Sequence, residues 1–417
     1  MGQVAVGQGG SKRAGDPARR AGGPDHFCRF KEMLLLLASE PGFVLPLAEG
    51  RKTGDQYRGY QQSHVITPVR RGRCRQHRVL KQENYSRYVI SLLITMSIWV
   101  AAVVAGAALA HAQDSIRGAD RVVAVGDVHG GHEEFTAVLR MAGIVNETGS
   151  WIGGKTHLVQ TGDVVDRGPE SRRALDLLMA LEKEARKAGG QVHALIGNHE
   201  AMNVYGDLRY LVAADYESFR TPKSEKALED AFRRSLPEGS KATEEGRKAW
   251  LATRPPGWVE HREAFSPDGK YGSWILRHNA VLRIGDTLFL HGGIAPKFVT
   301  ASIRDLNDRV RQELRDPAKL NGGIVTDPDG PLWFRGLAQE PEEKLAAHVE
   351  EVLANFKVRR IVIGHTVEKT GIKSRFSGKV VMIDVGLSKI YGGPKACLVI
   401  EGGKAFALEN GQRRELP

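Results

Sequence analysis

The chain has 417 residues and a formal net charge of +11, a length that can hold two or three domains. The charge is unevenly distributed: residues 1–87 contain 16 Lys and Arg against 7 Asp and Glu, a net +9, so residues 88–417 carry only +2. An isoelectric point near 9.5 would suggest a nucleic-acid partner. The near-neutral charge of residues 88–417 excludes a nucleic-acid partner.

Residues 1–87 form the first segment. They are rich in Gly, Arg and Pro, lack sustained hydrophobic periodicity and include the basic run RRGRCRQHR at 70–78. We expect this segment either to be disordered or to be sequence translated upstream of the true start.

Residues 88–112 form the second segment. Tyr88 to Ala110 carry no charge, basic residues precede them, and Ala110-His111-Ala112 fits a small-residue cleavage site. The segment therefore predicts a signal peptide cleaved before Gln113 or, if it is retained, a membrane anchor spanning 88–110. In either case we expect residues 113–417 to lie outside the cytoplasm, exported to the periplasm or the medium, or anchored there.

An unbroken apolar strand at 122–125 runs into Gly126-Asp127-Val128-His129-Gly130. Side chains two residues apart in an extended chain point the same way, so Asp127 and His129 are able to converge beyond the strand end. Open α/β sheets bind their ligands outside the carboxyl ends of the strands. The stretch therefore predicts a metal site.

Four later strands end in the same way. They are HLVQTGDVVDRG at 157–168, VHALIGNHE at 192–200, TLFLHGG at 287–293 and RIVIGHT at 360–366. Solvated turns would not repeat this chemistry at five strand ends. The donors that these ends supply are Asp127, His129, Asp163, Asn198, His291 and His365.

This donor set contains oxygen and nitrogen but no thiolate, which favours Mn, Fe or Zn. Six donors are more than one catalytic ion with an open position requires. We therefore expect two divalent metal ions that share a carboxylate, an arrangement suited to phosphoryl displacement.

Helices are predicted between these strands. Pro169 opens an amphipathic segment that ends at Gly189-Gly190, and residues 341–357 follow the same pattern. Residues 207–272 are polar and helix-prone, and we expect them to be an insertion that caps the site. The alternation predicts an α/β fold, with 113–417 as a single domain.

The ordered motifs GDVHG, GDVVDRG, GNHE, HGG and GHT resemble the phosphoprotein phosphatase branch of the metallophosphoesterases. The runs GNHEAMNVYGDLRY at 197–210 and GPLWFRG at 330–336 resemble the Shewanella-like protein phosphatases in particular. The likeness spans roughly residues 120–401. It implies the calcineurin-like fold, a sandwich of two mixed β-sheets flanked by helices, and phosphomonoester hydrolysis by water that two metal ions activate.

The resemblance also implies which residues hold the metals. The first ion would be held by Asp127, His129 and Asp163, and the second by Asp163, Asn198, His291 and His365. Asp163 would bridge the two ions.

The remaining roles follow from the same resemblance. His199 would be the general acid and Asp166 its partner. Arg167 and Arg335 would bind the phosphate oxygens, and arginine's bidentate fork suits that task. We expect Glu200 to anchor its loop through hydrogen bonds.

The stretch IDVGLSKIYGGPKACLVIE at 383–401 departs from the Ser-Ala-Pro-Asn-Tyr signature of the classical serine/threonine branch, which leaves the substrate class open. Asp384, after the strand at 380–383, is expected to be a turn residue rather than support for a metal-binding histidine. We expect a phosphorylated protein as substrate. The alternatives are a dinucleoside tetraphosphate, small phosphomonoesters for a broad exported phosphatase, and no substrate at all for a non-catalytic binding protein.

Overall fold

The computed structural model describes residues 112–417. The segment predicted at 1–87 and the signal or anchor segment predicted at 88–112 lie outside the described residues, except for Ala112. Within 112–417, no helix is both long and apolar enough to cross a membrane.

Two six-stranded sheets form the centre of the domain. The first has the order β1 (Ser115–Ile116), β5 (Val281–Ile284), β6 (Thr287–Leu290), β7 (Arg360–Ile363), β9 (Val380–Met382) and β8 (Lys373–Arg375). The second has the order β12 (Gln412–Glu415), β11 (Lys404–Glu409), β10 (Ala396–Glu401), β2 (Arg121–Val125), β3 (His157–Gln160) and β4 (Gln191–Ala194).

Each sheet is mixed, as the resemblance implied. Strands β2, β3 and β4 are parallel in one sheet, and β6, β7 and β9 are parallel in the other. Leu158 lies opposite both Val123 and Val192, and Val362 lies opposite both Phe289 and Val381. This register brings the carboxyl ends of neighbouring strands to the same edge of each sheet.

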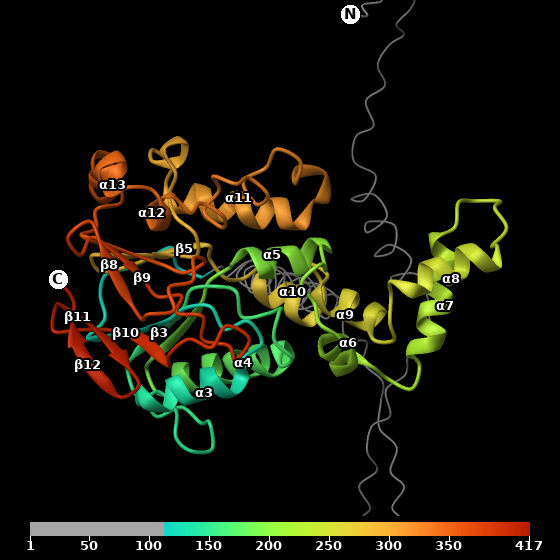
Figure 1. The fold of residues 1–417 in the computed structure, drawn as a ribbon, viewed down its shortest axis with the longest axis horizontal. Coiled ribbons are helices and arrows are strands. Elements are labelled where there is room, and N and C mark those ends of the chain that lie inside the picture. Colours follow the sequence, from blue (N-terminus) through green and yellow to red (C-terminus); the bar gives the residue numbers. More distant parts are fainter. Residues whose placement is uncertain (1–111) are drawn as a thin grey trace, which may run out of the picture. The chain divides into compact units, whose positions relative to one another are not determined.

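Helices cover both sides of the sheets (Figure 1). Helices α3 and α4 lie on one side, and α11, α12 and α13 lie on the other. Their bounds are α3 (His132–Met141), α4 (Ser171–Lys187), α11 (Ile303–Arg315), α12 (Gly336–Gln339) and α13 (Glu342–Phe356), with 3-10 turns η1 (Pro296–Phe298) and η2 (Pro317–Lys319). The helix predicted to open at Pro169 begins at Ser171, and it buries Ala174, Leu178 and Leu181 against the core.

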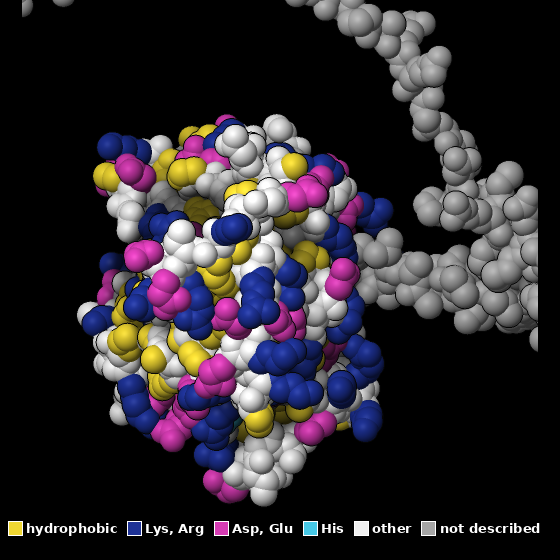
Figure 2. Space-filling view, turned by 90° about the vertical axis from the view of Figure 1, so that its right-hand side faces the viewer, with side chains coloured by type: hydrophobic (Ala, Val, Ile, Leu, Met, Phe, Trp, Pro, Cys, Tyr) yellow, Lys and Arg dark blue, Asp and Glu magenta, His cyan; other side chains and the backbone are white. Residues whose placement is uncertain are grey.

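Five helices follow α5 (Asn198–Tyr205) before β5 is reached: α6 (Ala213–Phe219), α7 (Ser224–Ser235), α8 (Glu244–Ala252), α9 (Trp258–Phe265) and α10 (Lys270–Ile275). Helix α9 packs against α5, whereas α7 and α8 lie farthest from the sheets (Figure 1). On the face shown in Figure 2, Lys and Arg side chains are interspersed with Asp and Glu side chains, which fits the near-neutral charge of this part of the chain.

Candidate metal centre and active site

The predicted donors meet where the carboxyl ends of the two sets of parallel strands face each other. Asp127 and His129 follow β2, Asp163 follows β3, and Asn198 follows β4. His291 and His365 follow β6 and β7 of the other sheet. All six side chains are buried. The structure therefore brings together every residue predicted to bind metal.

The backbone of this region is strained. Nine non-glycine residues have a positive φ in the described part of the chain, and five of them belong to the predicted site: His129, Asp163, Asp166, Arg167 and His365. Each such residue costs on the order of 1 kcal/mol. Strain of this kind persists only where the surrounding structure holds it, and it concentrates at functional sites.

Two glycines permit the close approaches that the site requires. A Cβ on Gly126 would lie 2.2 Å from the carbonyl oxygen of Ile383, and one on Gly197 would lie 2.3 Å from Oδ1 of Asp163. The side chain of Glu200 accepts backbone hydrogen bonds from Asp163, Val164 and Gly197, at 2.7, 2.8 and 2.9 Å. The prediction that Glu200 anchors its loop is confirmed.

One group of donors surrounds Nε2 of His291. This nitrogen lies 2.9 Å from Oδ1 of Asn198, 3.0 Å from Nδ1 of His365 and 3.2 Å from Oδ2 of Asp163. Nδ1–H of His291 donates to the carbonyl oxygen of Thr161 at 3.0 Å, so Nε2 is the ring nitrogen that faces the group. Acceptor atoms that converge in this way fit a cation.

A second group shares Asp163. Its Oδ2 lies 3.7 Å from Nε2 of His129 and 3.8 Å from Nε2 of His199. Oδ2 of Asp127 lies 3.8 Å from Nε2 of His129, and Nδ1–H of His129 donates to the Val165 carbonyl oxygen at 3.1 Å. The donor atoms of His129, Asp163 and His199 lie within 4.8 Å of one another, as do those of Asp163, His291 and His365. Asp163 is thus common to both groups.

The protonation states also suit cation binding. Burial lowers the pKa of His129 to about 4 and that of His365 to about 2, so both rings are neutral at pH 7. Burial would raise the pKa of Asp163, but the imidazoles of His291 and His199 hold it well below its usual range. Within residues 112–417, the only charge partners of Asp127 and Asp163 inside 4 Å are histidines, so bound cations would supply the missing positive charge.

His199 is oriented by a carboxylate on the Nδ1 side of its ring. Its Nδ1 lies 2.6 Å from Oδ2 of Asp166, and Nδ2 of Asn203 donates to Oδ1 of Asp166 at 2.9 Å. Burial lowers the pKa of His199, but the carboxylates of Asp163 and Asp166 more than offset it and raise the value above normal. Nε2 faces Asp163, so the ring is placed to act either as the predicted acid or as a metal ligand.

Three aromatic side chains border the site histidines. The ring of Tyr391 contacts His129 at a centroid distance of 5.4 Å, that of Tyr210 contacts His199 at 4.9 Å, and that of Trp333 contacts His365 at 5.9 Å. No feature of the sequence pointed to Tyr391. All three rings are partly exposed, so they form the rim of the site.

The two predicted phosphate-binding arginines lie at this rim. The guanidinium of Arg167 stacks over the ring of Tyr210 at 4.3 Å, and its buried Nε has no hydrogen-bond partner within residues 112–417. Arg335 is exposed and donates to the carbonyl oxygen of His365 and to Oγ1 of Thr366. A groove of about 740 Å³ continues from Tyr210, Trp333 and Arg335 along Tyr205.

Asp384 is a turn residue, as predicted, and it also lies near a residue predicted to bind metal. Its Oδ1 accepts the backbone N–H of Gly386 at 2.9 Å, as a turn residue does, but the side chain is also buried beside Asp127. Burial, followed by the charges of Asp384 and Asp163, raises the pKa of Asp127. The Asp384 side chain therefore makes the predicted turn contact and also lies near the carboxyl group of Asp127.

Three further histidines, His157, His193 and His278, make contacts away from the two donor groups. Nδ1 of His157 lies 3.1 Å from Nε2 of His193, and His278 packs edge-on against Trp274. Neither contact includes a residue of the two donor groups.

Comparison with known proteins assigns the domain to a family. A model of calcineurin-like phosphoesterases matches residues 120–369. Shewanella-like protein phosphatase 2 of Arabidopsis thaliana is 31% identical over 287 residues, covering 65% of this chain and 72% of the relative. An uncharacterized protein of Schizosaccharomyces pombe is 34% identical and covers 67% and 76% of the two chains.

The crystal structure of a cold-active protein-tyrosine phosphatase from a psychrophilic Shewanella species superposes with a TM-score of 0.58 at 26% identity, covering 74% of this chain and 83% of that one. The family model spans more than half of the chain and contains every residue predicted to bind metal. The protein is therefore an enzyme of the calcineurin-like metallophosphoesterase family, related to the Shewanella-like protein phosphatases.

Proposed function

We propose that this enzyme hydrolyses phosphomonoesters on protein side chains, phosphotyrosine included. The observation that carries the proposal is the shared carboxylate Asp163, whose Oδ2 lies 3.2 Å from His291, 3.7 Å from His129 and 3.8 Å from His199. The aromatic rim and the adjoining groove suit a peptide that carries a phosphorylated aromatic side chain. The likeness to a Shewanella protein-tyrosine phosphatase supports the same substrate class.

The residues would divide the metal binding as the family resemblance implies. Asp127 and His129 would serve one ion, Asn198, His291 and His365 the other, and Asp163 both. Two bound divalent cations, with Mn²⁺ the ion we propose, would supply positive charge at the phosphoryl oxygens and lower the pKa of a nearby water.

The chain's own side chains would position the substrate and move the proton. Arg167, with Arg335 at the rim, would donate hydrogen bonds to the phosphoryl oxygens as negative charge builds up on them. His199 would give the proton on Nε2 to the leaving oxygen. Asp166 would hold Nδ1–H, which fixes the ring so that Nε2 faces the reaction.

A substrate panel tests this assignment. With Mn²⁺ present, kcat/KM for phosphotyrosine, phosphothreonine and phosphoserine peptides is expected to exceed that for diadenosine tetraphosphate and glucose 6-phosphate by roughly 10-fold or more. A preference for the dinucleotide would favour the tetraphosphate hydrolase, and equal rates on all substrates a broad exported phosphatase. Inactivity on every substrate would favour a binding protein.

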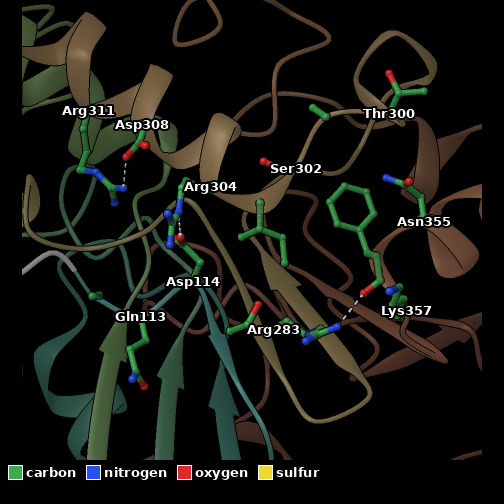
Figure 3. A pocket seen from close by; sticks show the side chains of 15 residues that line it. Gln113, Asp114, Arg283, Thr300, Ser302, Arg304, Asp308, Arg311, Asn355 and Lys357 are labelled. Atoms are coloured by element: carbon green, nitrogen blue, oxygen red, sulfur yellow. Dashed lines mark hydrogen bonds and ion pairs between the residues drawn. The ribbon is translucent and has the colours of Figure 1, made fainter.

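We further propose that the domain is exported, with Gln113 as its first residue where the preceding segment is cleaved. The residues after the predicted cleavage site are part of the fold: the Gln113 carbonyl oxygen accepts a hydrogen bond from Nδ2 of Asn279 at 2.9 Å, and Asp114 accepts one from Asn307 at 2.8 Å. Figure 3 shows Asp114 paired with Arg304 at the edge of a cavity of about 940 Å³, whose lining includes no predicted site residue.

N-terminal sequencing of protein recovered from cell fractions checks this proposal. We expect a chain that starts at Gln113 in the periplasmic or extracellular fraction, or an uncleaved chain in the membrane fraction. An intact chain in the soluble cytoplasmic fraction would contradict it.

A further inference from the structure

Asn203 is a polar residue at a buried position of a helix. It lies on α5, one turn after His199, and its side chain shares a helix face with that histidine. Only 1% of the residue is exposed. Asparagine is a poor helix former because its amide competes with the backbone for hydrogen bonds, and a buried amide has to be paired. The helix itself therefore gives no reason for an asparagine here, and the partners of the side chain have to supply one.

Both hydrogens of the Asn203 amide are used. Nδ2 donates to Oδ1 of Asp166 at 2.9 Å and to the carbonyl oxygen of His199 at 2.9 Å. Because a carboxylate and a carbonyl oxygen both accept hydrogen bonds, turning the amide over would place its own oxygen against them. That oxygen, Oδ1 of Asn203, is buried and has no hydrogen-bond partner within residues 112–417. The two donated hydrogen bonds are therefore what the amide contributes at this position.

The two carboxylate oxygens of Asp166 have different partners. Oδ2 lies 2.6 Å from Nδ1 of His199, whereas Oδ1 accepts from Asn203. The backbone of Asp166 is fixed separately, since its N–H donates to Oγ of Ser171 at 3.0 Å. A carboxyl group still rotates with little preference about its bond to Cβ. The hydrogen bond from Asn203 therefore sets the plane of the carboxylate and which oxygen faces the imidazole.

The end of the helix that carries Asn203 is fixed by the helical insertion. The guanidinium of Arg262 on α9 donates to the carbonyl oxygen of Asn203 and, at 3.2 Å, to that of Val204. Helix α5 ends at Gly206, whose φ is 96°, and the guanidinium lies against the bare backbone of this glycine. The last turn of α5 is thus held in place by contacts other than the hydrogen bond to Asp166.

We propose that Asn203 is a positioning residue for the general acid. By holding Oδ1 of Asp166, it turns Oδ2 toward Nδ1–H of His199, so that Nε2 of the imidazole stays directed at the leaving oxygen. Its second hydrogen bond joins the same amide to the backbone of His199, so one side chain sets the acid and its partner relative to each other. This inference rests on the proposed role of His199 and adds to it a residue that is neither a proposed metal ligand nor a proposed substrate contact.

The test compares phenyl phosphate with nitrophenyl phosphate at saturating Mn²⁺. Phenolate is a stronger base than nitrophenolate, so its departure depends more on a proton from His199. The ratio of kcat/KM for phenyl phosphate to that for nitrophenyl phosphate does not depend on the fraction of folded enzyme. In Asn203→Leu, which removes both N–H groups at nearly constant size, we expect this ratio to fall on the order of 10-fold, with two metal ions still bound. Asn203→Ala, which adds no branched side chain, is expected to show the same fall.

Asn307 on α11 provides a matched control. It is also buried, and its Nδ2 also donates to a carboxylate, that of Asp114, and to a backbone carbonyl oxygen, that of Val281, each at 2.8 Å. Because it lies outside the site, Asn307→Leu is expected to lower the Tm and to leave the ratio unchanged. In a His199→Asn background, Asn203→Leu should lower the ratio no further, because the acid that it positions is already missing.

The possible outcomes separate this inference from the proposals on which it rests. A ratio that falls in His199→Asn but in neither Asn203 variant would overturn the inference, and so would a further fall in the His199→Asn background or a failure of both Asn203 variants to fold. An unchanged ratio in His199→Asn itself would contradict the proposed acid and the inference with it. A wild type that hydrolyses both aryl esters but no phosphopeptide would contradict only the proposed substrate.

Discussion

Replacing Asp163 with asparagine is expected to remove at least one metal ion and to lower kcat by roughly 10³-fold or more, since bound metal contributes several kcal/mol of transition-state stabilisation. Oδ2 of Asp163 is the atom that both donor groups share. The amide keeps the size of the side chain but loses the charge that both ions would use. Metal analysis of the purified variant, together with its turnover of nitrophenyl phosphate, measures both effects.

Asp230→Asn is the matched control for this variant. Asp230 lies on α7 and, among the residues that the structure describes, pairs only with the exposed Lys226, at 3.4 Å. We expect it to keep two ions and full activity. Two ions per chain and ordinary turnover in Asp163→Asn would show that Asp163 bridges nothing.

The second large effect is expected for His199→Asn. The variant should retain two metal ions and lose roughly 10²–10⁴-fold in rate on a phosphoserine peptide, the usual worth of a general acid, with a much smaller loss on nitrophenyl phosphate. The physical reason is the leaving group, because serine alkoxide requires the proton that His199 would supply and nitrophenolate does not. Steady-state rates on the two substrates at saturating Mn²⁺ measure the difference.

The structure leaves His199 close enough to Asp163 to act as a ligand, so the same variant decides between the two roles. As a ligand, His199 would take metal with it when replaced, and both substrates would lose rate equally. His157→Asn, which changes a histidine outside the site, should leave metal content and both rates unchanged.

The sequence was sufficient to predict the donors because each of them stands at a strand end. Periodicity identifies a buried strand, and the carboxyl ends of parallel strands share an edge, so Asp127, Asp163 and Asn198 become neighbours once β2, β3 and β4 pair. Glu200 was predictable in part, since a carboxylate in the first turn of a helix finds free N–H groups such as that of Gly197, whereas its contacts to Asp163 and Val164 join distant parts of the chain. The two mixed sheets, in contrast, were inferred from the family resemblance and not from the pattern.

The supporting residues could not be predicted, because their contacts join distant parts of the chain. Asp384 meets Asp127 only because the bare backbone of Gly126 lets the chain at Ile383 approach it. Arg172 at the start of α4 meets Ser218 of α6, 46 residues further along the chain. Hydrophobic periodicity specifies which face of a helix is buried and not which element it meets, so a short polar helix such as α6 gave no signal.

Anomalous diffraction from crystals soaked with Mn²⁺ and phosphate would locate the metal ions that Asp163 is proposed to share. We expect two Mn²⁺ peaks, one beside His129 and one beside His291 and His365, with Asp163 between them and phosphate within reach of Arg167. A single peak, or two peaks that do not share Asp163, would contradict the proposal.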